Sequence, residues 1–576
     1  MKKLLLGNEA IARGIYEAGA TFVSSYPGTP STEITEFVAD YKEVYAEWAP
    51  NEKVATEAAL GASVAGVRSF TAMKHVGLNV AADPLFTSAY TGVNGGFVIC
   101  VADDPAMHSS QNEQDSRHYA RAAKMPMLEP ADSAECRDFT RLAFEISEKF
   151  DTPVLLRTAT RVAHSQSLVE LHDREEVETR EYVKTPSKYV MNPGFGFARH
   201  TVVEKRLVDL KAYSETCGVN VEEIRSSEIG FVCAGACYEY VREAFPEASV
   251  YKIGLSHPMP IDSIKAFSEK VEKLYVVEEL DPVFETEMRA AGIRVDGGKD
   301  IFGLIGELSQ TKILEAMGKE AKKVRTFDEP VPARPPVMCA GCPHRGVFYT
   351  LSKMKLTVLG DIGCYTLGAA QPLSAVDSTV CMGASISMLH GFIKARPESA
   401  NKAVAVIGDS TFLHSGMTGL TDIAYNRSNA TVLILDNSIT GMTGHQQNPA
   451  TGFTLKMEAV PPVSLEKVCE AVGINRVRTV DPSDLKALEA ALKEELNAGE
   501  PSVIICRKPC MLLKYVKPKA ALMIDKEKCR GCRACMKLGC PAIRFENGKA
   551  MIDRGQCVGC GLCTQLCAFG AIGEAK

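Results

Sequence analysis

The chain has 576 residues, of which 46% are hydrophobic and 24% charged, a composition typical of a globular protein with several domains. Its formal net charge of −6 argues against nucleic acid as the main partner, because phosphate binding requires clustered Lys and Arg. No apolar run approaches ~18 residues and the N-terminal apolar stretch is short, so we predict a cytoplasmic protein without a membrane segment or a signal peptide. In that compartment the twenty cysteines indicate metal sites rather than disulfides.

The chain opens with a predicted amphipathic helix and a short strand, GNEAIARGIYEAGATFVSS. The loop YPGTPST follows at 26–32, and its two prolines and one glycine make it stiff. NEKVATEAALGASVAGVRSFTA at 51–72 contains the glutamates Glu52 and Glu57, and it overlaps FTAMKHVGLN at 70–79.

The next segments are less informative. In the polar stretch QNEQDSRHYAR at 111–121, Arg117 or His118 is a candidate to bind a substrate carboxylate, and an exposed loop is the alternative. Apolar runs that lead into helical spacing predict alternating strands and helices in 185–325. The charged, proline-rich stretch 321–336 has the composition of a linker.

Two apolar runs near residue 400 each end in candidate ligands. AVAVIG at 403–408 precedes Asp409, and ATVLIL at 430–435 precedes Asp436 and Asn437, with a helical stretch between them. The pattern predicts strand, helix and strand in a parallel sheet, which places ligand groups at the carboxyl ends of its strands.

A glycine-bearing loop, VCMGASIS at 380–387, precedes a predicted helix. Backbone amides at a helix N-terminus bind phosphate oxygens well. We therefore predict Gly383 and Ser385 as part of a phosphate cradle.

The last 48 residues contain eight cysteines in two similar runs, CRGCRACMKLGCP and CVGCGLCTQLC. Each run has three cysteines spaced by two residues and a fourth further on. Iron–sulfur clusters require four soft thiolates around one cubane, whereas zinc ribbons show two pairs rather than two triplets. The runs therefore predict iron–sulfur clusters.

This tail resembles a two-cluster bacterial ferredoxin domain, in which the fourth cysteine of each run binds the other cluster. The resemblance implies two [4Fe–4S] clusters, one held by Cys529, Cys532, Cys535 and Cys567, the other by Cys557, Cys560, Cys563 and Cys540. The spacer before Cys540 is one residue longer than the usual three, and Ala568 follows the last cysteine in place of proline.

GDS followed by Asn437 resembles the thiamine-diphosphate motif. The resemblance implies that Asp409, Asn437 and the carbonyl of Ile439 hold Mg²⁺, a hard cation that bridges the diphosphate to the protein, with Gly408 and Ser410 beside it. Thiamine enzymes pair this domain with one that carries a glutamate for the aminopyrimidine N1′. The position of Glu52 before Gly61 resembles that glutamate, and Glu57 fits less well.

YPGTPST resembles the YPxTP loop of 2-oxoacid:ferredoxin oxidoreductases, where the threonine, here Thr29, helps to position the substrate. FTAMKHVGLN matches the family's next active-site loop, so Lys74 and His75 are further candidates. With NEKVA, CAGCPHR and GDS, the chain most resembles the large (alpha) subunits of the branch that acts on indolepyruvate.

The resemblance implies oxidative decarboxylation of aryl 2-oxoacids, such as indolepyruvate and phenylpyruvate, to aryl-acetyl-CoA and CO₂. CoA is then a co-substrate, and electrons pass to a soluble ferredoxin. It also implies a smaller beta subunit and a dimer of heterodimers. A third, proximal [4Fe–4S] cluster is implied at Cys339, Cys342, Cys364 and Cys510, with Cys506 as a poorer fourth ligand.

The expected fold class is α/β and multidomain. The chain is expected to contain a pyrimidine-type thiamine-diphosphate domain at 1–180, a transketolase C-terminal-like α/β domain at 190–320, a diphosphate-type thiamine-diphosphate domain at 337–518, and a bacterial ferredoxin-like domain with two clusters at 522–576. Two alternative functions remain open. One is a non-redox thiamine decarboxylase or carboligase with an appended iron–sulfur domain, and the other is an electron-transfer module with a degenerate thiamine site.

Overall fold

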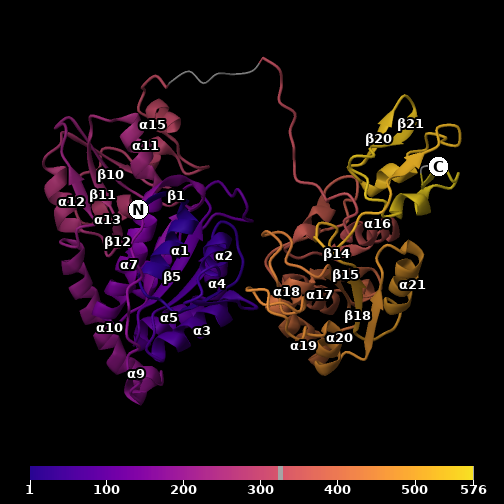
Figure 1. Ribbon diagram of the computed structural model, residues 1–576, viewed down its shortest axis with the longest axis horizontal. Helices are drawn as coiled ribbons and strands as arrows, with labels where there is room; N and C mark the ends of the chain where they lie inside the picture. The colour runs from indigo at the N-terminus through magenta and orange to yellow at the C-terminus, as the bar shows by residue number, and fades with distance from the viewer. Residues whose placement is uncertain (322–327, 575–576) are drawn as a thin grey trace. The chain divides into compact units, whose positions relative to one another are not determined.

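The computed structural model describes residues 1–321 and 328–574, in two compact units that comprise residues 1–327 and 328–576 (Figure 1). Part of the predicted linker, residues 322–327, lies outside the described residues. No helix in the described ranges combines the length and the apolar character that a membrane crossing requires. The four predicted domain ranges remain predictions, since the structure divides the chain only once.

Unit 1 contains a seven-stranded sheet in which all neighbouring strands are parallel except the first pair, which is antiparallel. From edge to edge the strands are β12 (Leu255–His257), β6 (Met127–Leu128), β7 (Val154–Ala159), β5 (Phe97–Asp103), β4 (Ser69–Lys74), β2 (Phe22–Ser25) and β3 (Tyr45–Trp48). Because the chain returns through helices, the carboxyl ends of the parallel strands meet at one edge of the sheet.

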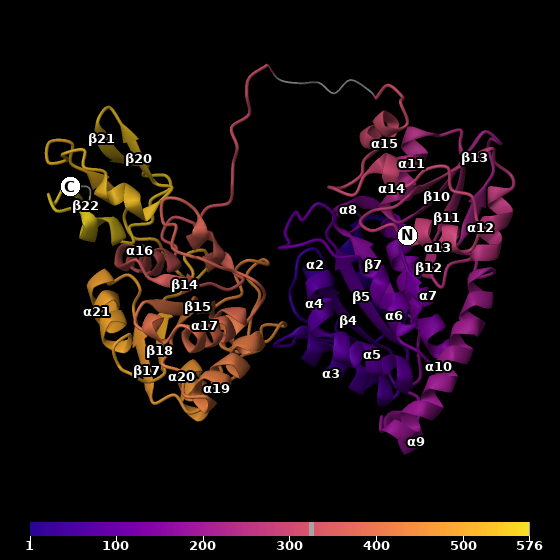
Figure 2. The same ribbon diagram turned by 180° about the vertical axis from the view of Figure 1, so that it is seen from behind.

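The helices of this part alternate with its strands. They are α1 (Gly7–Glu17), α2 (Thr32–Val38), α3 (Glu52–Val64), α4 (His75–Val80), α5 (Ala82–Thr91), α6 (Arg117–Ala123), α7 (Ser133–Phe150) and α8 (Thr160–His164). Strands β1 (Lys2–Leu6) and β8 (Gln166–Glu170) form a separate antiparallel pair. The short α9 (Pro186–Tyr189) leads to the long α10 (Pro193–Ser214), which runs beside α5 at the border of unit 1 (Figure 2).

A second, four-stranded sheet belongs to the same unit. Its order is β13 (Lys273–Val277), β10 (Ile229–Ala234), β11 (Ser249–Ile253) and β9 (Val221–Glu223), with only β9 antiparallel. Its helices are α11 (Ala236–Ala244), α12 (Ile261–Ser268), α13 (Val283–Ala290), α14 (Lys299–Phe302) and α15 (Gln310–Ala316). Strand β12 leaves this region to join the seven-stranded sheet, so the two sheets are linked.

Unit 2 is built on a five-stranded parallel sheet. Its order is β14 (Thr357–Leu359), β15 (Ala403–Gly408), β16 (Thr431–Asp436), β18 (Ser502–Arg507) and β17 (Arg476–Val480). The accompanying helices are α16 (His344–Met354), α17 (Ala384–Ala395), α18 (Asp409–Thr411), α19 (Met417–Tyr425), α20 (Leu465–Ala471) and α21 (Leu485–Glu495). Between α18 and α19 the helix widens into one π turn, Phe412–Gly416, a feature that is frequent at functional sites.

Both faces of this sheet are covered by apolar side chains. Ala405 and Ile407 of β15 belong to one buried cluster, while Val404 and Val406 belong to another. Successive side chains of a strand point to opposite faces, so continuous apolar runs are expected where helices cover both sides. The predictions of a multidomain α/β protein and of a parallel strand, helix and strand around Asp409 are confirmed.

The C-terminal tail contains little regular structure. Two antiparallel pairs frame it: β19 (Leu522–Ile524) with β22 (Ile572–Glu574), and β20 (Ile543–Glu546) with β21 (Lys549–Ile552). Two short 3₁₀ turns, Ala534–Leu538 and Leu562–Leu566, lie between them. Cysteines supply part of the tail core, and Cys529, Cys535 and Cys563 are buried in it.

Candidate functional site

The loop after β2 and the end of β4 meet at the carboxyl edge of the seven-stranded sheet. A side chain at Gly28 would place its Cβ 3.2 Å from Lys74 Cγ, so the YPGTPST loop lies directly on Lys74. Lys74 Nζ donates to the carbonyl of Ser109 at 3.0 Å, and Ser109 Oγ donates to the carbonyl of Thr29 at 3.3 Å. Thr29 and Lys74 are therefore held next to each other through a third loop.

Glu52 begins α3 at the same edge. Asn51 caps this helix by accepting a hydrogen bond from Val54 N at 2.9 Å. The Glu52 side chain is only 4% exposed and lies over Gly77, where an added Cβ would come within 2.5 Å of Glu52 Oε1. A side chain at position 77 would force this carboxylate to move.

The environment of Lys74 and His75 is partly desolvated. Burial lowers the pKa of Lys74, although the negative charges of Asp104 and Glu52 act in the opposite direction. Burial also lowers the pKa of His75, whose Nε2 lies 3.1 Å from the carbonyl of Asn112. A contact with a carbonyl requires a proton on Nε2. The lowered pKa favours the neutral ring, in which the buried Nδ1, which has no hydrogen-bond partner in the described chain, is an acceptor.

Asp104, which the motif reading did not single out, organises this edge. It accepts hydrogen bonds from Ser109 N at 2.8 Å, Ser110 Oγ at 2.7 Å and Thr160 Oγ1 at 2.7 Å, and so fixes the loop that holds Lys74. It directly follows the apolar strand β5. Asp104 could have been predicted in the same way as Asp409, as an acidic residue directly after an apolar parallel strand.

Arg117 is not available to a substrate carboxylate. Its guanidinium is 3% exposed and pairs with Glu278 Oε2 at 2.6 Å and with Asp115 Oδ2 at 2.5 Å. His118 Nε2 lies 2.9 Å from Asp281 Oδ2. For Arg117 the structure corrects both predictions. It is not a substrate-binding cation, because carboxylates of the chain already pair with it, and it is not part of an exposed loop, because it is buried at the start of α6.

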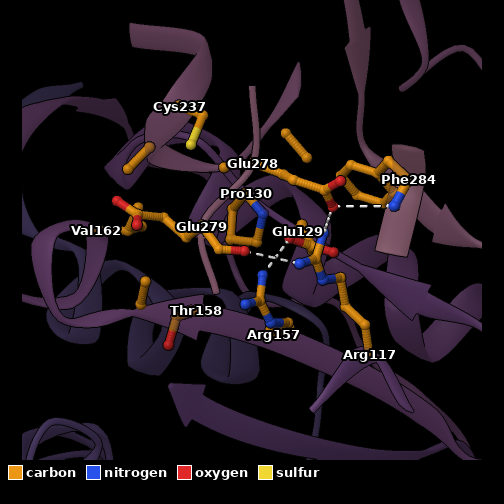
Figure 3. Close-up of a pocket in the computed structure, with 14 residues that line it drawn as sticks. Arg117, Glu129, Pro130, Arg157, Thr158, Val162, Cys237, Glu278, Glu279 and Phe284 are labelled. Atoms are coloured by element: carbon orange, nitrogen blue, oxygen red, sulfur yellow. Dashed lines mark hydrogen bonds and ion pairs between the residues drawn. The ribbon is translucent and has the colours of Figure 1, made fainter. Parts of the chain in front are cut away.

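Arg117 lines a polar cavity of about 380 Å³, counted with the space open to solvent, between the seven-stranded sheet and the start of α11 (Figure 3). Arg157 pairs there with Glu129 at 2.6 Å and with Asp103 at 2.6 Å. Cys237 lies on the opposite wall. The alternating charges join residues of both sheets of unit 1, which indicates a structural role for this cluster.

In unit 2, Asp409 and Asn437 leave neighbouring parallel strands at the same edge, because β15 and β16 pair Gly408 with Leu435. Asp409 is 2% exposed; its Oδ1 accepts from Ser410 N at 2.9 Å, while Oδ2 has no hydrogen-bond partner among the described residues. Burial, with the charge of Asp436, raises its pKa to about 7. A buried carboxylate oxygen without a donor suits a cation ligand, so these residues fit Mg²⁺.

Hydrogen bonds hold the neighbouring loop in place. Asn437 Oδ1 accepts from Ile439 N at 3.3 Å, and Ser410 Oγ accepts from Thr440 Oγ1 at 3.0 Å. The carbonyl of Asn437 also accepts from Cys510 N at 2.9 Å, which ties the loop to the segment after β18.

The backbone amides predicted to form a phosphate cradle have an acceptor within the chain. The amides of Gly383 and Ser385 donate to the carboxylate of Asp361 at 2.9 and 3.0 Å, so a side chain of the chain itself already uses them. Asp361 is completely buried and also accepts from Ile362 N at 2.8 Å. The sequence reading missed it because the acidic residue lies far from the glycine loop in the chain.

The four proximal cysteines come together next to the Asp409 loop. Burial, then the neighbouring thiols of Cys510 and Cys339, raise the pKa of Cys364 to about 11. Cys342, whose pKa burial raises to about 12, has Cys339 and Cys364 as neighbours. Burial raises the pKa of Cys510, and the charges of Cys339 and Asp409 add to this effect. Cys506, the alternative ligand, is 2% exposed and packs in the core of the sheet.

The eight tail thiols separate into the two predicted sets. Cys535 has Cys529, Cys532 and Cys567 as electrostatic neighbours, and Cys563, whose pKa burial raises to about 12, has Cys560, Cys540 and Cys557.

The thiols of each tail set surround a space rather than a point. Within 1–321 and 328–574 no three His, Cys, Asp or Glu side chains converge on a single-ion site, but each set lines a cavity, of about 340 Å³ for the Cys529 set and about 380 Å³ for the Cys557 set. Soft thiolates around such a space fit a cluster.

Three family models match the chain. Residues 13–214 match "Pyruvate flavodoxin/ferredoxin oxidoreductase, thiamine diP-bdg", residues 361–506 match "Thiamine pyrophosphate enzyme, C-terminal TPP binding domain", and residues 521–568 match "4Fe-4S dicluster domain". The Glu52 region, the Asp409 region and the eight tail cysteines lie within the respective matches.

Relatives extend over the whole length. Indolepyruvate oxidoreductase subunit IorA of Archaeoglobus fulgidus is 38% identical, covering 100% of this chain and 98% of the relative. The chain belongs to the indolepyruvate oxidoreductase subunit IorA family. The IorA protein of Thermococcus kodakarensis is 39% identical over 100% of this chain and 97% of its own length. A solved 2-oxoglutarate:ferredoxin oxidoreductase of Magnetococcus marinus aligns with a TM-score of 0.45 and 17% identity over 55% of this chain and 65% of that chain.

Proposed function

We propose that this IorA family member is the large subunit of an enzyme that oxidatively decarboxylates indolepyruvate and other aryl 2-oxoacids, such as phenylpyruvate. The products are aryl-acetyl-CoA and CO₂, and two electrons leave one at a time through iron–sulfur clusters to ferredoxin. The observation that carries this proposal is the separation of eight tail thiols into two four-thiol sets in the same unit as the Asp409 site. A decarboxylase without redox chemistry has no use for such an outlet.

We infer that unit 1 supplies the aminopyrimidine half of a thiamine-diphosphate site and unit 2 the diphosphate half. Glu52 would hold the pyrimidine N1′, and Asp409, Asn437 and the Ile439 carbonyl would hold Mg²⁺ on the diphosphate. When bound, thiamine diphosphate supplies the electron sink that decarboxylation of a 2-oxoacid requires. The buried, unpaired Asp409 Oδ2 supports this assignment.

Lys74, His75 and Thr29 are the proposed substrate-binding groups. The Lys74 ammonium is the cation at this edge that suits a 2-oxoacid carboxylate, and Thr29 limits where the substrate can lie. Neutral His75 offers Nδ1 as a hydrogen-bond acceptor at a buried position. Their assembly around Ser109 and Asn112 supports the proposal.

Cys339, Cys342, Cys364 and Cys510 are the proposed ligands of a proximal cluster, which the proximity of these thiols to one another supports. The remaining proposed parts lie partly outside this chain: a smaller beta subunit, CoA as acyl acceptor, and a dimer of heterodimers. The four-stranded sheet of unit 1 is proposed to be the transketolase C-terminal-like domain.

The test is anaerobic reduction of ferredoxin by the chain with its partner subunit. We expect reduction that depends on indolepyruvate, CoA and thiamine diphosphate with Mg²⁺ together. Release of CO₂ at the same rate without any electron acceptor would instead indicate the non-redox decarboxylase class.

A further inference from the structure

Arg345, in the CAGCPHR motif, is an unusual buried arginine. It is the second residue of α16 and only 2% exposed. Among the described residues no carboxylate lies within ion-pair distance of its guanidinium, and its Nε has no hydrogen-bond partner. Buried arginines are rare unless paired, since an uncompensated charge in the interior costs several kcal/mol, roughly 3–5 when a partner is removed. Something else must therefore compensate this charge.

The guanidinium is fixed between two cysteine-bearing segments. Nη2 donates to the carbonyls of Met338 and Cys339, at 2.6 and 3.1 Å, and Nη1 donates to the carbonyl of Leu538 at 2.6 Å. The first two carbonyls belong to the loop of Cys339 and Cys342, and the third comes two residues before Cys540. Three bonds to backbone oxygens hold the charge at one position.

The same loops touch at a second point. Gly341, with φ of 72°, lies so close to the tail that an added Cβ would come within 2.3 Å of Val558 Cγ2. Val558 stands between Cys557 and Cys560. The proximal loop and the Cys557 set are therefore packed directly on each other, with Arg345 beside the contact.

Arg345 also lines the cavity of the Cys557 set. Among the described lining residues it is the only charged side chain, and the others besides the cysteines are apolar or glycine. Its charge lowers the pKa of Cys540, against the larger effect of burial. The cavity of the Cys529 set is different, because its arginines, Arg530 and Arg533, are exposed to solvent. Water screens those charges, but not the charge of Arg345.

We propose that Arg345 is a positioning residue whose fixed positive charge raises the reduction potential of the cluster held by Cys540, Cys557, Cys560 and Cys563. Reduction of a [4Fe–4S] cluster adds one electron and one negative charge, and a buried cation next to it stabilises the reduced form. The four thiolates in turn compensate the guanidinium. This inference rests on the proposed function, since it requires the tail clusters. A higher reduction potential at the Cys557 set would favour electron transfer from the proximal loop into the tail.

The test is an EPR-monitored redox titration of the anaerobically purified holoenzyme. We expect Arg345→Met and Arg345→Gln to shift the midpoint potential of one tail cluster to more negative values and to leave the Cys529-set cluster unchanged. Arg345→Lys, which keeps the charge, should stay near the wild-type value. A Cys532→Ser background, which alters only the signal of the Cys529 set, assigns the two signals.

Arg544→Met is the matched control, because Arg544 also lies in the tail but is 57% exposed and paired with Asp553 at 3.2 Å. We expect no shift there. Equal potentials in wild type and Arg345→Met, or an equal shift in Arg345→Lys, would overturn the tuning role. Loss of iron from both Arg345→Met and Arg345→Gln would also overturn the tuning role and would indicate a purely structural role for Arg345. Wild-type protein without tail iron would instead contradict the proposed function itself.

Discussion

Glu52 and Glu57 lie on the same helix, but in different surroundings. Glu52 is 4% exposed and lies over Gly77, whereas Glu57 is 46% exposed and pairs with Lys53 on the outer face. A proton-handling carboxylate contributes about 10²–10⁴-fold to a rate, and a solvated one contributes little. We expect Glu52→Gln to lower ferredoxin reduction by roughly that factor, and Glu57→Gln to leave it unchanged. Equal activities of the two variants would contradict the assignment of Glu52.

A second residue, His257 at the end of β12, makes the stability of unit 1 depend on pH. Both ring nitrogens are buried without hydrogen-bond partners among the described residues, and burial lowers the pKa of His257 to about 4. The unfolded chain, with a pKa near ~6.5, binds a proton that the folded chain does not. The contribution of neutral His257 to the free energy of unfolding is therefore fully present above about pH 6.5. It is lost as the pH falls toward 4, which lowers the free energy of unfolding by up to about 3 kcal/mol.

The single tryptophan, Trp48 in β3, reports the unfolding of this unit by fluorescence. Urea unfolding at pH 7.5 and pH 5 should show a smaller pH difference in His257→Gln than in wild type. Identical pH differences would show that His257 is not the responsible group.

At the scale of elements, two arginines on α6 allow a buried ion pair to be compared with an exposed one. Arg117 pairs with Asp115, just before α6, and with Glu278, just after β13 of the four-stranded sheet. Arg121 pairs with Glu287 at 3.0 Å and is 42% exposed. Removing Arg117 takes away the ion-pair partner of the buried Glu278, whose pKa burial already raises. Asp115 would keep Arg157, at 3.8 Å. We expect Arg117→Met to cost roughly 3–5 kcal/mol and Arg121→Met less than about 1 kcal/mol.

Trp48 fluorescence in urea at pH 7.5 measures both variants in the same unit. An equal loss in both would mean that the cluster of Figure 3 does not join the two sheets. A loss of activity in Arg117→Met at unchanged stability would instead return Arg117 to the candidate substrate groups.

Elements defined by local patterns were predictable, while pairings between distant segments were not. The apolar runs around Asp409 predicted β15 and β16, because a buried parallel strand is apolar on both faces. The resemblance of the tail to a two-cluster ferredoxin domain predicted which thiols lie together. In contrast, the Asp361 carboxylate on Gly383 and the burial of Arg117 by Glu278 depend on residues far apart in the chain. No local period encodes such contacts, so the sequence revealed neither the acceptor of the Gly383 amide nor the burial of Arg117.

At the scale of the whole molecule, the two units divide the groups of the proposed chemistry between them. Unit 1 carries the Glu52 edge, and unit 2 carries the Asp409 edge, the proximal thiols and the tail. Within unit 2 the Cys339 loop contacts the Cys557 set through Gly341 and Arg345, while the Cys529 set lines a separate cavity. With clusters bound at these sites, the arrangement would favour one-electron transfer from the proximal loop to the Cys557 set and then to the Cys529 set.

The iron content of the intact chain tests this arrangement. Three [4Fe–4S] clusters require about twelve iron atoms per chain. Cys510 lies among the proximal thiols and Cys506 packs in the core four residues earlier, so they form a matched pair. We expect anaerobically purified Cys510→Ala to contain about eight iron atoms and Cys506→Ala about twelve. Full iron in Cys510→Ala would remove the proximal cluster, and a loss of about four atoms in Cys506→Ala would transfer the fourth ligand to Cys506.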